Sequence, residues 1–275
     1  YHIFYMMKIS KSNSDFFIKK AKRNSLHYIL KGQIFNKMNE DELSLEFNDK
    51  DYTAKVVNSP YAYGDILIPK IVKYGSNDYI ITSISKYAFK DNKNIKSIKF
   101  SADSKLTLIE KNAFYGSSIE SIYLPPSVNE IEEGWCNSTP KLTTITVSPE
   151  NSLYQFYDDK FLLKKSQKDK EEYDVLLFAR RDIKQGTIPP FISHICQYCF
   201  CDCKGLESIQ FSEESKLKSI SKNSFFKSPI TSIQIPPNLE KLEEGWCKGC
   251  LKLTEIILSP KNKNFLYLDD QFLIQ

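Results

Sequence analysis

The chain has 275 residues, of which 41% are apolar, so it is long enough to bury a substantial hydrophobic core. Its formal net charge is only +4, a weak field over this length, which argues against binding to nucleic acid. The sequence has no apolar run that approaches a signal-peptide core or the ~18 residues of a membrane span. We therefore expect no membrane span in this chain.

Residues 1–50 follow no pattern that defines a fold, and we interpret them as an N-terminal lead-in that is partly helical. The helical expectation rests on a rough stripe of apolar residues at helix-like spacing: Phe16, Phe17, Ala21, Leu26, Ile29 and Leu30. The basic run Lys19–Arg23 lies in the same segment. Such a run is either a nucleic-acid or targeting patch or, as we favour, the solvated face of a helix.

Residues 51–88 are predicted to hold the N-terminal capping hairpins and the first coil of a repeat. One hairpin is indicated where the strand-like segments 43–47 and 52–57 flank a polar turn. A second is indicated where segments 71–74 and 79–82 flank another polar turn. Hairpins at this position would shield the open end of a stack of repeats.

One long segment of the chain occurs twice, because a shift of 111 residues aligns it without a gap to the C-terminal part. Trp135 then matches Trp246, and the block Glu132–Cys136 matches Glu243–Cys247. A fixed internal period is the signature of a repeat architecture. In chain order, the array divides into copy 1, a hairpin connection and copy 2: residues 89–163, 164–191 and 192–275. Since the last strand has no closing cap, we expect further repeats in a longer protein.

Within each copy, four-residue segments alternate polar and apolar residues, as expected of short strands with one buried face. The six segments are Ser97–Phe100, Ser121–Leu124, Thr144–Val147, Ser208–Phe211, Ser232–Ile235 and Glu255–Leu258. Their spacing of about 23 residues is typical of leucine-rich repeats, which have roughly 20–29 residues each. Each unit also carries an aromatic residue that we expect to fill the interior of the stacked coils: Phe89, Phe114, Trp135, Phe200, Phe225 and Trp246.

The order Ile-x-x-x-Ala-Phe, then Cys or Asn, Leu or Ile, and Ser-Ile resembles the BspA-type leucine-rich repeat, and residues 84–100 and 195–211 carry it. The longer form, with Glu132–Cys136 and Tyr173–Ile183, resembles BspA-like surface proteins of parasitic protists, trichomonads in particular. The resemblance implies a strand-rich α/β leucine-rich-repeat solenoid, with β-hairpin insertions at the N-terminal end and between the two copies. It also implies a cell-surface location and a role in adhesion or protein interaction. It brings no catalytic motif, so we expect no enzyme activity and no cofactor.

The cysteines are the first candidates for chemistry, because Cys196, Cys199, Cys201 and Cys203 lie close together and Cys247 and Cys250 form a Cys-x-x-Cys pair. Thiolates in such numbers are typical zinc ligands. Their equivalents in copy 1 do not repeat the set, so we favour small apolar core residues and predict no metal site. The odd number of seven cysteines favours a reducing, intracellular compartment over a disulfide framework.

Histidines and glutamates are the remaining candidates. None of the three histidines, His2, His27 and His194, is expected to lie beside a Ser or Cys for nucleophilic catalysis. The pairs Glu132/Glu133 and Glu243/Glu244 recur with the repeat, so we interpret them as turn or capping residues.

The surface with the strongest physical argument is the outer side of the predicted strands. If Ile98 and Phe100 point inward, Lys99 points outward, and the same alternation exposes one central residue on every strand. The predicted partner-binding strand face is Lys99, Tyr123, Thr146, Gln210, Gln234 and Ile257. Solenoids commonly bind partners through such surfaces, so the first hypothesis is a non-enzymatic protein that binds another protein or a host or matrix surface. In the alternative, the row is only solvated and the protein is an intracellular scaffold or structural repeat protein.

Overall fold

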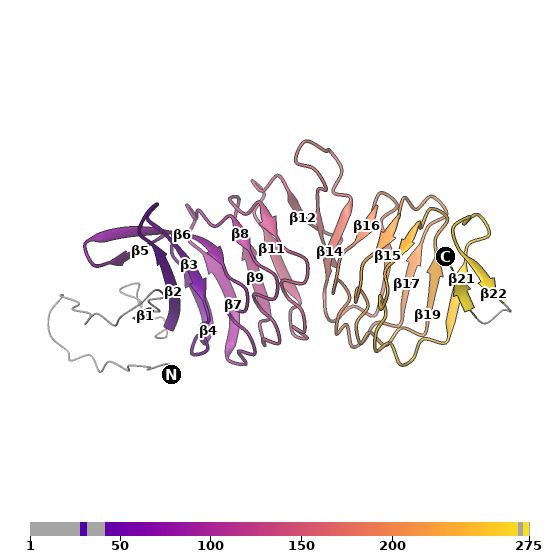
Figure 1. Ribbon diagram of the computed structural model, residues 1–275, viewed down its shortest axis with the longest axis horizontal. Helices are drawn as coiled ribbons and strands as arrows, with labels where there is room; N and C mark the ends of the chain where they lie inside the picture. The colour runs from indigo at the N-terminus through magenta and orange to yellow at the C-terminus, as the bar shows by residue number, and fades with distance from the viewer. Residues whose placement is uncertain (1–27, 32–41, 269–271, 275) are drawn as a thin grey trace.

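The computed structural model describes residues 28–31, 42–268 and 272–274. These residues form strands and turns and contain no helix. Figure 1 shows the strands stacked along one long axis, from the N-terminal hairpins to the C-terminal end of the array. The strand-rich solenoid with its hairpins is therefore confirmed. The described residues are more purely β than the expected α/β class, since short turns occupy the side that a helix would fill.

One face of the solenoid consists of parallel strands that follow one another coil by coil. In copy 1, β4, β7, β9 and β11 form one sheet: Gly64–Ile68, Ile95–Phe100, Ser121–Leu124 and Thr144–Val147. In copy 2, β15 pairs with β17 and β19 pairs with β21: Gln185–Ile188, Ser208–Phe211, Ser232–Ile235 and Glu255–Leu258. All six segments predicted from the sequence are strands. Along each one, apolar side chains that point into the core alternate with side chains, mostly polar, that face solvent.

A second face carries two sheets of similar topology, in each of which longer strands precede two-residue strands. In the first, the antiparallel strands β1, β2 and β3 precede the parallel strands β6, β8 and β10, and β5 pairs with β6: Tyr28–Lys31, Glu42–Asn48, Thr53–Val57, Asn77–Ile84, Leu108–Ile109, Glu130–Ile131 and Ile71–Tyr74. In the second, β12, β13 and β14 precede β16, β18 and β20: Tyr154–Tyr157, Phe161–Lys164, Val175–Ala179, His194–Ile195, Ser219–Ile220 and Lys241–Leu242. Strands β22 and β23 form a final antiparallel pair: Leu266–Leu268 and Phe272–Ile274.

The N-terminal hairpin is the structural counterpart of the hairpin between the copies. In β3, Val56 pairs in parallel with Ile84 of β6, and in β14 Leu176 pairs in parallel with Ile195 of β16. Ile84 and Ile195 are themselves equivalent in the internal repeat. The repeating unit is therefore larger than the sequence comparison indicates, and it begins with an antiparallel hairpin in both copies.

A third face is built from turns that place two residues in the left-handed region in every coil. The first lies three residues after the Ile or Leu of the coil and the second four residues later: Tyr87 and Asp91, Asn112 and Gly116, Gly134 and Ser138, Tyr198 and Asp202, Asn223 and Lys227, Gly245 and Gly249. Successive turns are joined by backbone hydrogen bonds, such as Phe89 N–H to Ala113 O at 2.8 Å and Phe200 N–H to Ser224 O at 2.7 Å. The turns therefore stack in register, as the strands do.

The interior aromatic residues form the same stack in both copies. Phe89 stacks on Phe114 with ring centroids 5.2 Å apart, and Phe114 meets Trp135 edge to face at 5.8 Å. The equivalents in copy 2 repeat both arrangements at 4.7 and 5.8 Å: Phe200, Phe225 and Trp246. Both tryptophans are buried, as predicted. Each such ring pair contributes about 0.5–1.5 kcal/mol beyond the burial of its area.

The hairpin β13–β14 is buried on both faces and separates two hydrophobic clusters. One face belongs to the cluster of copy 1: Leu162, Leu177 and Phe178. The other belongs to the cluster of copy 2: Phe161, Leu163, Leu176 and Ala179. A fully buried Leu or Phe contributes about 1.5–3 kcal/mol relative to an exposed one. The side chains of this hairpin therefore pack in both hydrophobic clusters and stabilise both copies.

The prediction of a helix in the N-terminal segment is wrong for Ile29 and Leu30, because both residues lie in strand β1. That strand pairs antiparallel with β2, with Ile29 opposite Ser44, so a backbone ladder satisfies the outer edge of β2. The other expectations for this region lie outside the described residues: Phe16, Phe17, Ala21 and Leu26 of the helical stripe, the basic run Lys19–Arg23, and His2 and His27.

Candidate binding surfaces

The predicted strand-face residues all lie on the outer side of the parallel strands. Lys99, Thr146, Gln210 and Ile257 are exposed, and Tyr123 and Gln234 are half-buried. Their strand neighbours continue the row: Leu67 pairs with Lys99, Tyr123 with Thr146, Thr187 with Gln210, and Gln234 with Ile257. In copy 1 the row crosses a single sheet, because β7 also pairs with β9. In copy 2 it crosses two separate strand pairs, whose strands β17 and β19 lie side by side.

A second outward row on the same strands consists mainly of hydroxyl side chains. It contains Asp65, Ser97, Ser121, Thr144, Gln185, Ser208, Ser232 and Glu255, of which Ser97 is buried beneath its neighbours. The Ser97 hydroxyl donates to Asp65 Oδ1 at 2.6 Å, so part of the row is held by its own contacts. The strand face is thus a mainly polar surface that carries three charged side chains, Asp65, Lys99 and Glu255.

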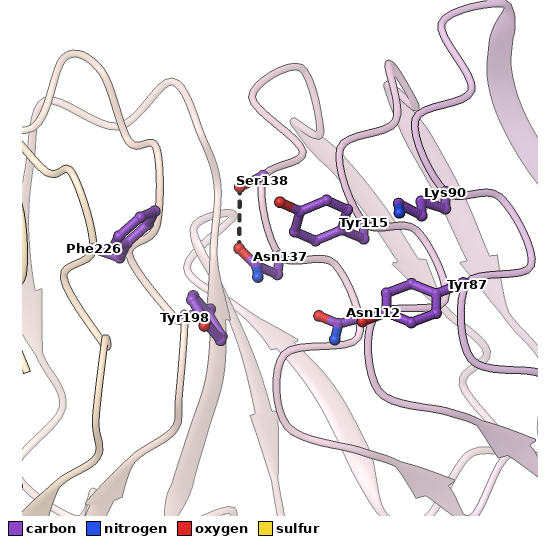
Figure 2. A pocket seen from close by; sticks show the side chains of 8 residues that line it. All are labelled: Tyr87, Lys90, Asn112, Tyr115, Asn137, Ser138, Tyr198 and Phe226. Atoms are coloured by element: carbon purple, nitrogen blue, oxygen red, sulfur yellow. Dashed lines mark hydrogen bonds between the residues drawn. The ribbon is translucent and has the colours of Figure 1, made fainter.

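An aromatic pocket opens on the turn face, where copy 1 meets copy 2. Its volume is about 390 Å³, and its lining residues are Tyr87, Lys90, Asn112, Tyr115, Asn137, Ser138, Tyr198 and Phe226. Two edge-to-face ring pairs contribute, Tyr87 with Tyr115 at 6.3 Å and Tyr198 with Phe226 at 6.0 Å. Figure 2 shows these pairs on either side of Asn137. The pairs are equivalent in the internal repeat. They were not predicted from the sequence, because the aromatic pattern of the coils marks only the buried ring of each.

Two tyrosines of the aromatic pocket have strained backbones. Tyr87 has φ 62° and Tyr198 φ 61°. A left-handed conformation costs an ordinary L-residue about 1–2 kcal/mol. The same position in the other coils holds residues that tolerate it better: Asn112, Gly134, Asn223 and Gly245. The surrounding turns thus keep both tyrosines in this conformation despite its cost in conformational free energy.

A buried arginine joins the two copies beneath the aromatic pocket. Arg181 is 2% exposed, and its guanidinium donates to Cys199 O at 2.7 Å and Cys136 O at 3.5 Å. It also lies 4.4 Å from the centre of the Phe178 ring. The guanidinium therefore bonds carbonyl oxygens of both copies at the place where the regular ladder of turns is interrupted.

Most of the cysteines are buried in the core, in keeping with small apolar residues. Cys199 and Cys203 pack in the hydrophobic cluster of copy 2. Burial raises the pKa of Cys136 to about 11 and the pKa of Cys201 to about 12. These thiols are therefore protonated at neutral pH.

The paired glutamates serve as turn caps, with one exception. Glu132 accepts a hydrogen bond from Lys111 N–H at 2.6 Å, and Glu243 accepts one from Lys222 N–H at 2.8 Å. The interpretation as capping residues is thus confirmed for these two. Glu133 instead accepts from Gln197 N–H of copy 2 at 2.9 Å and lies 3.6 Å from His194 Nε2.

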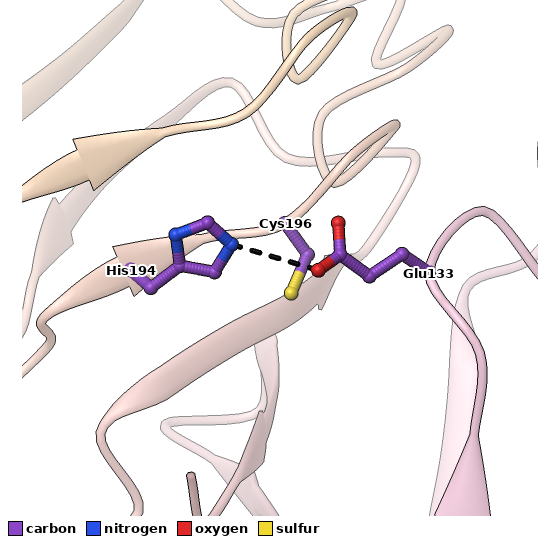
Figure 3. A group of neighbouring side chains, drawn as sticks. All are labelled: Glu133, His194 and Cys196. Atoms are coloured by element: carbon purple, nitrogen blue, oxygen red, sulfur yellow. Dashed lines mark ion pairs between the residues drawn. The ribbon is translucent and has the colours of Figure 1, made fainter. Parts of the chain in front are cut away.

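His194 lies beside a serine and a cysteine, a proximity that was not expected, and the absence of nucleophilic catalysis at this histidine stays a prediction. Because β16 and β18 pair in parallel, Ser219 lies opposite His194, and its hydroxyl is 2.6 Å from His194 Nδ1. Glu133 and Cys196 lie on the other side of the ring, as Figure 3 shows. Cys196 is 2% exposed, and burial raises its pKa well above the ordinary value. The thiol is therefore no accessible nucleophile.

Comparison with known proteins shows the family of this fold. A family model described as BspA type leucine rich repeat region matches residues 70–166 and 175–268 in 6 copies. A leucine-rich repeat protein from Eubacterium ventriosum is similar in structure, with a TM-score of 0.52 and 18% identity over 80% of this chain and 71% of that chain. A leucine rich cell surface protein from Faecalibacterium prausnitzii gives a TM-score of 0.38 and 14% identity over 83% and 96%.

No curated protein matches the chain, and the resemblance to protist members stays a prediction. None of the described residues forms a helix long and apolar enough to cross a membrane. The matched segments cover more than half of the sequence, and their repeats are the stacked coils of the structure. The chain belongs to the BspA-type leucine-rich-repeat family.

Proposed function

We propose that the protein is a non-enzymatic binding protein that uses its strand face to hold another protein or a host or matrix surface. The observation that carries the proposal is the pair of outward rows that runs across successive parallel strands. Backbone pairing fixes the strands about 4.8 Å apart, so the side chains are presented at regular spacing. A surface of this kind binds without ordering flexible loops, which lowers the entropic cost of association.

The character of the strand face supports a partner with a flat, mixed surface. The exposed apolar side chains Leu67 and Ile257 stand among mainly polar ones, and Leu67 is paired with Lys99. Interfaces bind through such apolar and aromatic anchors, with polar residues around them. The weak net charge gives little long-range steering, so contact chemistry decides the affinity. Adhesion at a cell surface is the more specific form of this proposal, and an intracellular scaffold is the alternative.

The test is adhesion of the purified chain to immobilised laminin and collagen, measured by biolayer interferometry. The variant K99E/Q210E/Q234E places new negative charge along the strand face and is expected to weaken binding at least tenfold. A control with the same change in net charge, K168E/K222E, alters exposed lysines outside the strands and is expected to bind as the unmodified chain does. Binding that the strand-face variant retains in full would remove this face as the adhesive surface.

A further inference from the structure

Glu133, His194 and Cys196 form a cluster of potential metal ligands at the junction between the copies. Glu133 comes from the turn after β10, whereas His194 and Cys196 flank Ile195 at the end of β16. Alternation along the strand places His194 and Cys196 on one side and Ile195 on the other, so that Cys196 packs in the hydrophobic cluster of copy 1 and Ile195 in that of copy 2. The three ligand atoms all lie within 4.8 Å of one another, and Figure 3 shows them facing a common point.

Neighbouring groups already hold two of these side chains in position. Ser219 Oγ lies 2.6 Å from His194 Nδ1, and His194 Nε2 lies 3.2 Å from Ser221 Oγ and 3.6 Å from Glu133 Oε1. Gln197 N–H donates to Glu133 Oε2 at 2.9 Å, which leaves Oε1 directed at His194. Metal-binding histidines and carboxylates are commonly oriented in this way by a hydrogen bond on the atom that does not bind the metal.

The internal repeat shows that the fold itself does not need these residues. The equivalents of His194 and Cys196 in copy 1 are Ser83 and Ser85, which are buried in the same coil position. The equivalent of Glu133 in copy 2 is Glu244, which is exposed. Within the part of the chain that the structure describes, such a ligand set is thus assembled only where a glutamate of copy 1 meets the histidine and cysteine of copy 2.

We propose that Glu133, His194 and Cys196 bind one zinc ion that joins copy 1 to copy 2. A thiolate, an imidazole and a carboxylate together are a typical donor set for Zn²⁺. Tetrahedral zinc at its usual bond lengths sets its ligands roughly 3.3–3.8 Å apart. The 3.6 Å between His194 Nε2 and Glu133 Oε1 already meets that requirement, and a small rotation of the Cys196 side chain would complete it. Water or the Ser221 hydroxyl, which lies 3.2 Å from His194 Nε2, would take the fourth position.

Binding would release the thiol proton of Cys196 to solvent, so that sulfur forms a bond to zinc as its S–H bond breaks. Affinity is therefore expected to rise with pH over the neutral range. The ion would bridge the two copies at the coil where the ladder of backbone hydrogen bonds between turns is replaced by the side chain of Arg181.

The test is titration of the reduced, metal-free full chain with Zn²⁺ by calorimetry, and with Co²⁺ by absorption spectroscopy. We expect one ion per chain and a thiolate-to-cobalt charge-transfer band. Both are expected to be lost in C196S and in H194S, which carry the serines that copy 1 tolerates, and affinity is expected to fall at least tenfold in E133Q. The control C247S removes a different thiol, part of the Cys-x-x-Cys pair, and should keep both signals.

Two results would overturn the proposal. One is the absence of a stoichiometric Zn²⁺ complex in the unmodified chain at neutral pH. The other is a complex that survives in the double variant H194S/C196S, or that C247S abolishes, since the ion would then bind elsewhere. Circular dichroism of each variant separates a lost site from a lost fold, because C196S and H194S are expected to retain the β-sheet spectrum of the unmodified chain.

Discussion

At the scale of single residues, the junction between the copies depends on a few positions that require both a left-handed backbone and a small side chain. Gly134 has φ +77°, and a Cβ atom built on it would lie 3.0 Å from Tyr198 Cδ2. Gly245, its equivalent in copy 2, has φ +72° but no atom within 4 Å of the same Cβ position. The two glycines therefore share the requirement for a left-handed backbone and differ only in the close approach of the tyrosine ring.

This difference predicts unequal losses of stability on substitution with alanine. Gly245→Ala is expected to lower the free energy of unfolding by about 1–2 kcal/mol, the cost of the left-handed backbone. Gly134→Ala is expected to cost about 1 kcal/mol more, because the Tyr198 ring must move. Urea denaturation followed by tryptophan fluorescence measures both. Equal losses would show that Tyr198 does not pack on Gly134 in solution.

Asp174 makes the protein sensitive to acid. Burial alone would raise its pKa, but hydrogen bonds from Lys170, the Ser166 N–H and Ser193 outweigh it and hold the pKa at about 2. The folded-state pKa thus lies below the unfolded value, so the ionised carboxylate stabilises the fold at neutral pH. That contribution, about 2 kcal/mol, is lost as pH falls from about 5 towards 2.

The variant Asp174→Asn is expected to be less stable than the unmodified chain at pH 7, because the buried acceptor for Lys170 is weakened. The difference is expected to shrink as pH falls, since the unmodified chain loses the same contribution on protonation. Thermal unfolding monitored between pH 7 and pH 3 tests this. A stability difference that stays constant across the range would show that Asp174 is not the group that titrates.

At the scale of elements, one asparagine side chain replaces the backbone hydrogen bonds that a turn cannot make. Asn151 Nδ2 donates to Pro125 O and Val128 O at 3.0 Å each, and its Oδ1 accepts from the N–H groups of Leu153 and Tyr154 at 3.0 Å each. The side chain thereby ties the end of one coil to the start of β12. Asn262 makes the same kind of bonds in copy 2, but it is only half-buried.

Asn151→Ala is therefore expected to lower the free energy of unfolding by about 2–4 kcal/mol, because it leaves buried carbonyl and N–H groups without partners. Asn262→Ala removes the matching bonds where water can replace them, and it is expected to cost about 1 kcal/mol. Chemical denaturation of the two variants gives the comparison. If Asn262→Ala lowered the free energy of unfolding more than Asn151→Ala, the deeper burial of Asn151 would be contradicted.

The strands were predictable from the sequence, whereas the sites at the junction were not. Ile98 and Phe100 alternate with Lys99, and the same pattern returns every coil, so local periodicity alone places each strand and its outer face. Glu133 and His194 come together only because β13–β14 sets the start of copy 2 against the last turn of copy 1. Such a contact depends on how an irregular insertion packs, and no periodic pattern in the sequence encodes it.

At the scale of the whole molecule, the two copies are one stack because the hairpin β13–β14 serves both cores. Leu162 and Phe178 are fully buried on one face, and Phe161 and Leu176 are as deeply buried on the other. In a repeat protein, stability comes from the interfaces between neighbouring units as well as from the units themselves. The outward rows of the two copies keep a fixed relative position only if the interface formed by β13–β14 is stable. A strand face that extends across both copies therefore depends on this interface.

Hydrogen–deuterium exchange of the native chain, read by mass spectrometry, tests this claim most directly. Peptides that cover residues 161–164 and 175–179 are expected to be among the most slowly exchanging of the chain, because their amides are paired in the middle of a sheet between two cores. The hairpin β5–β6 at the N-terminal end is expected to exchange faster. Rapid exchange throughout the β13–β14 hairpin, with slow exchange only inside each copy, would show two separate arrays and contradict a single solenoid.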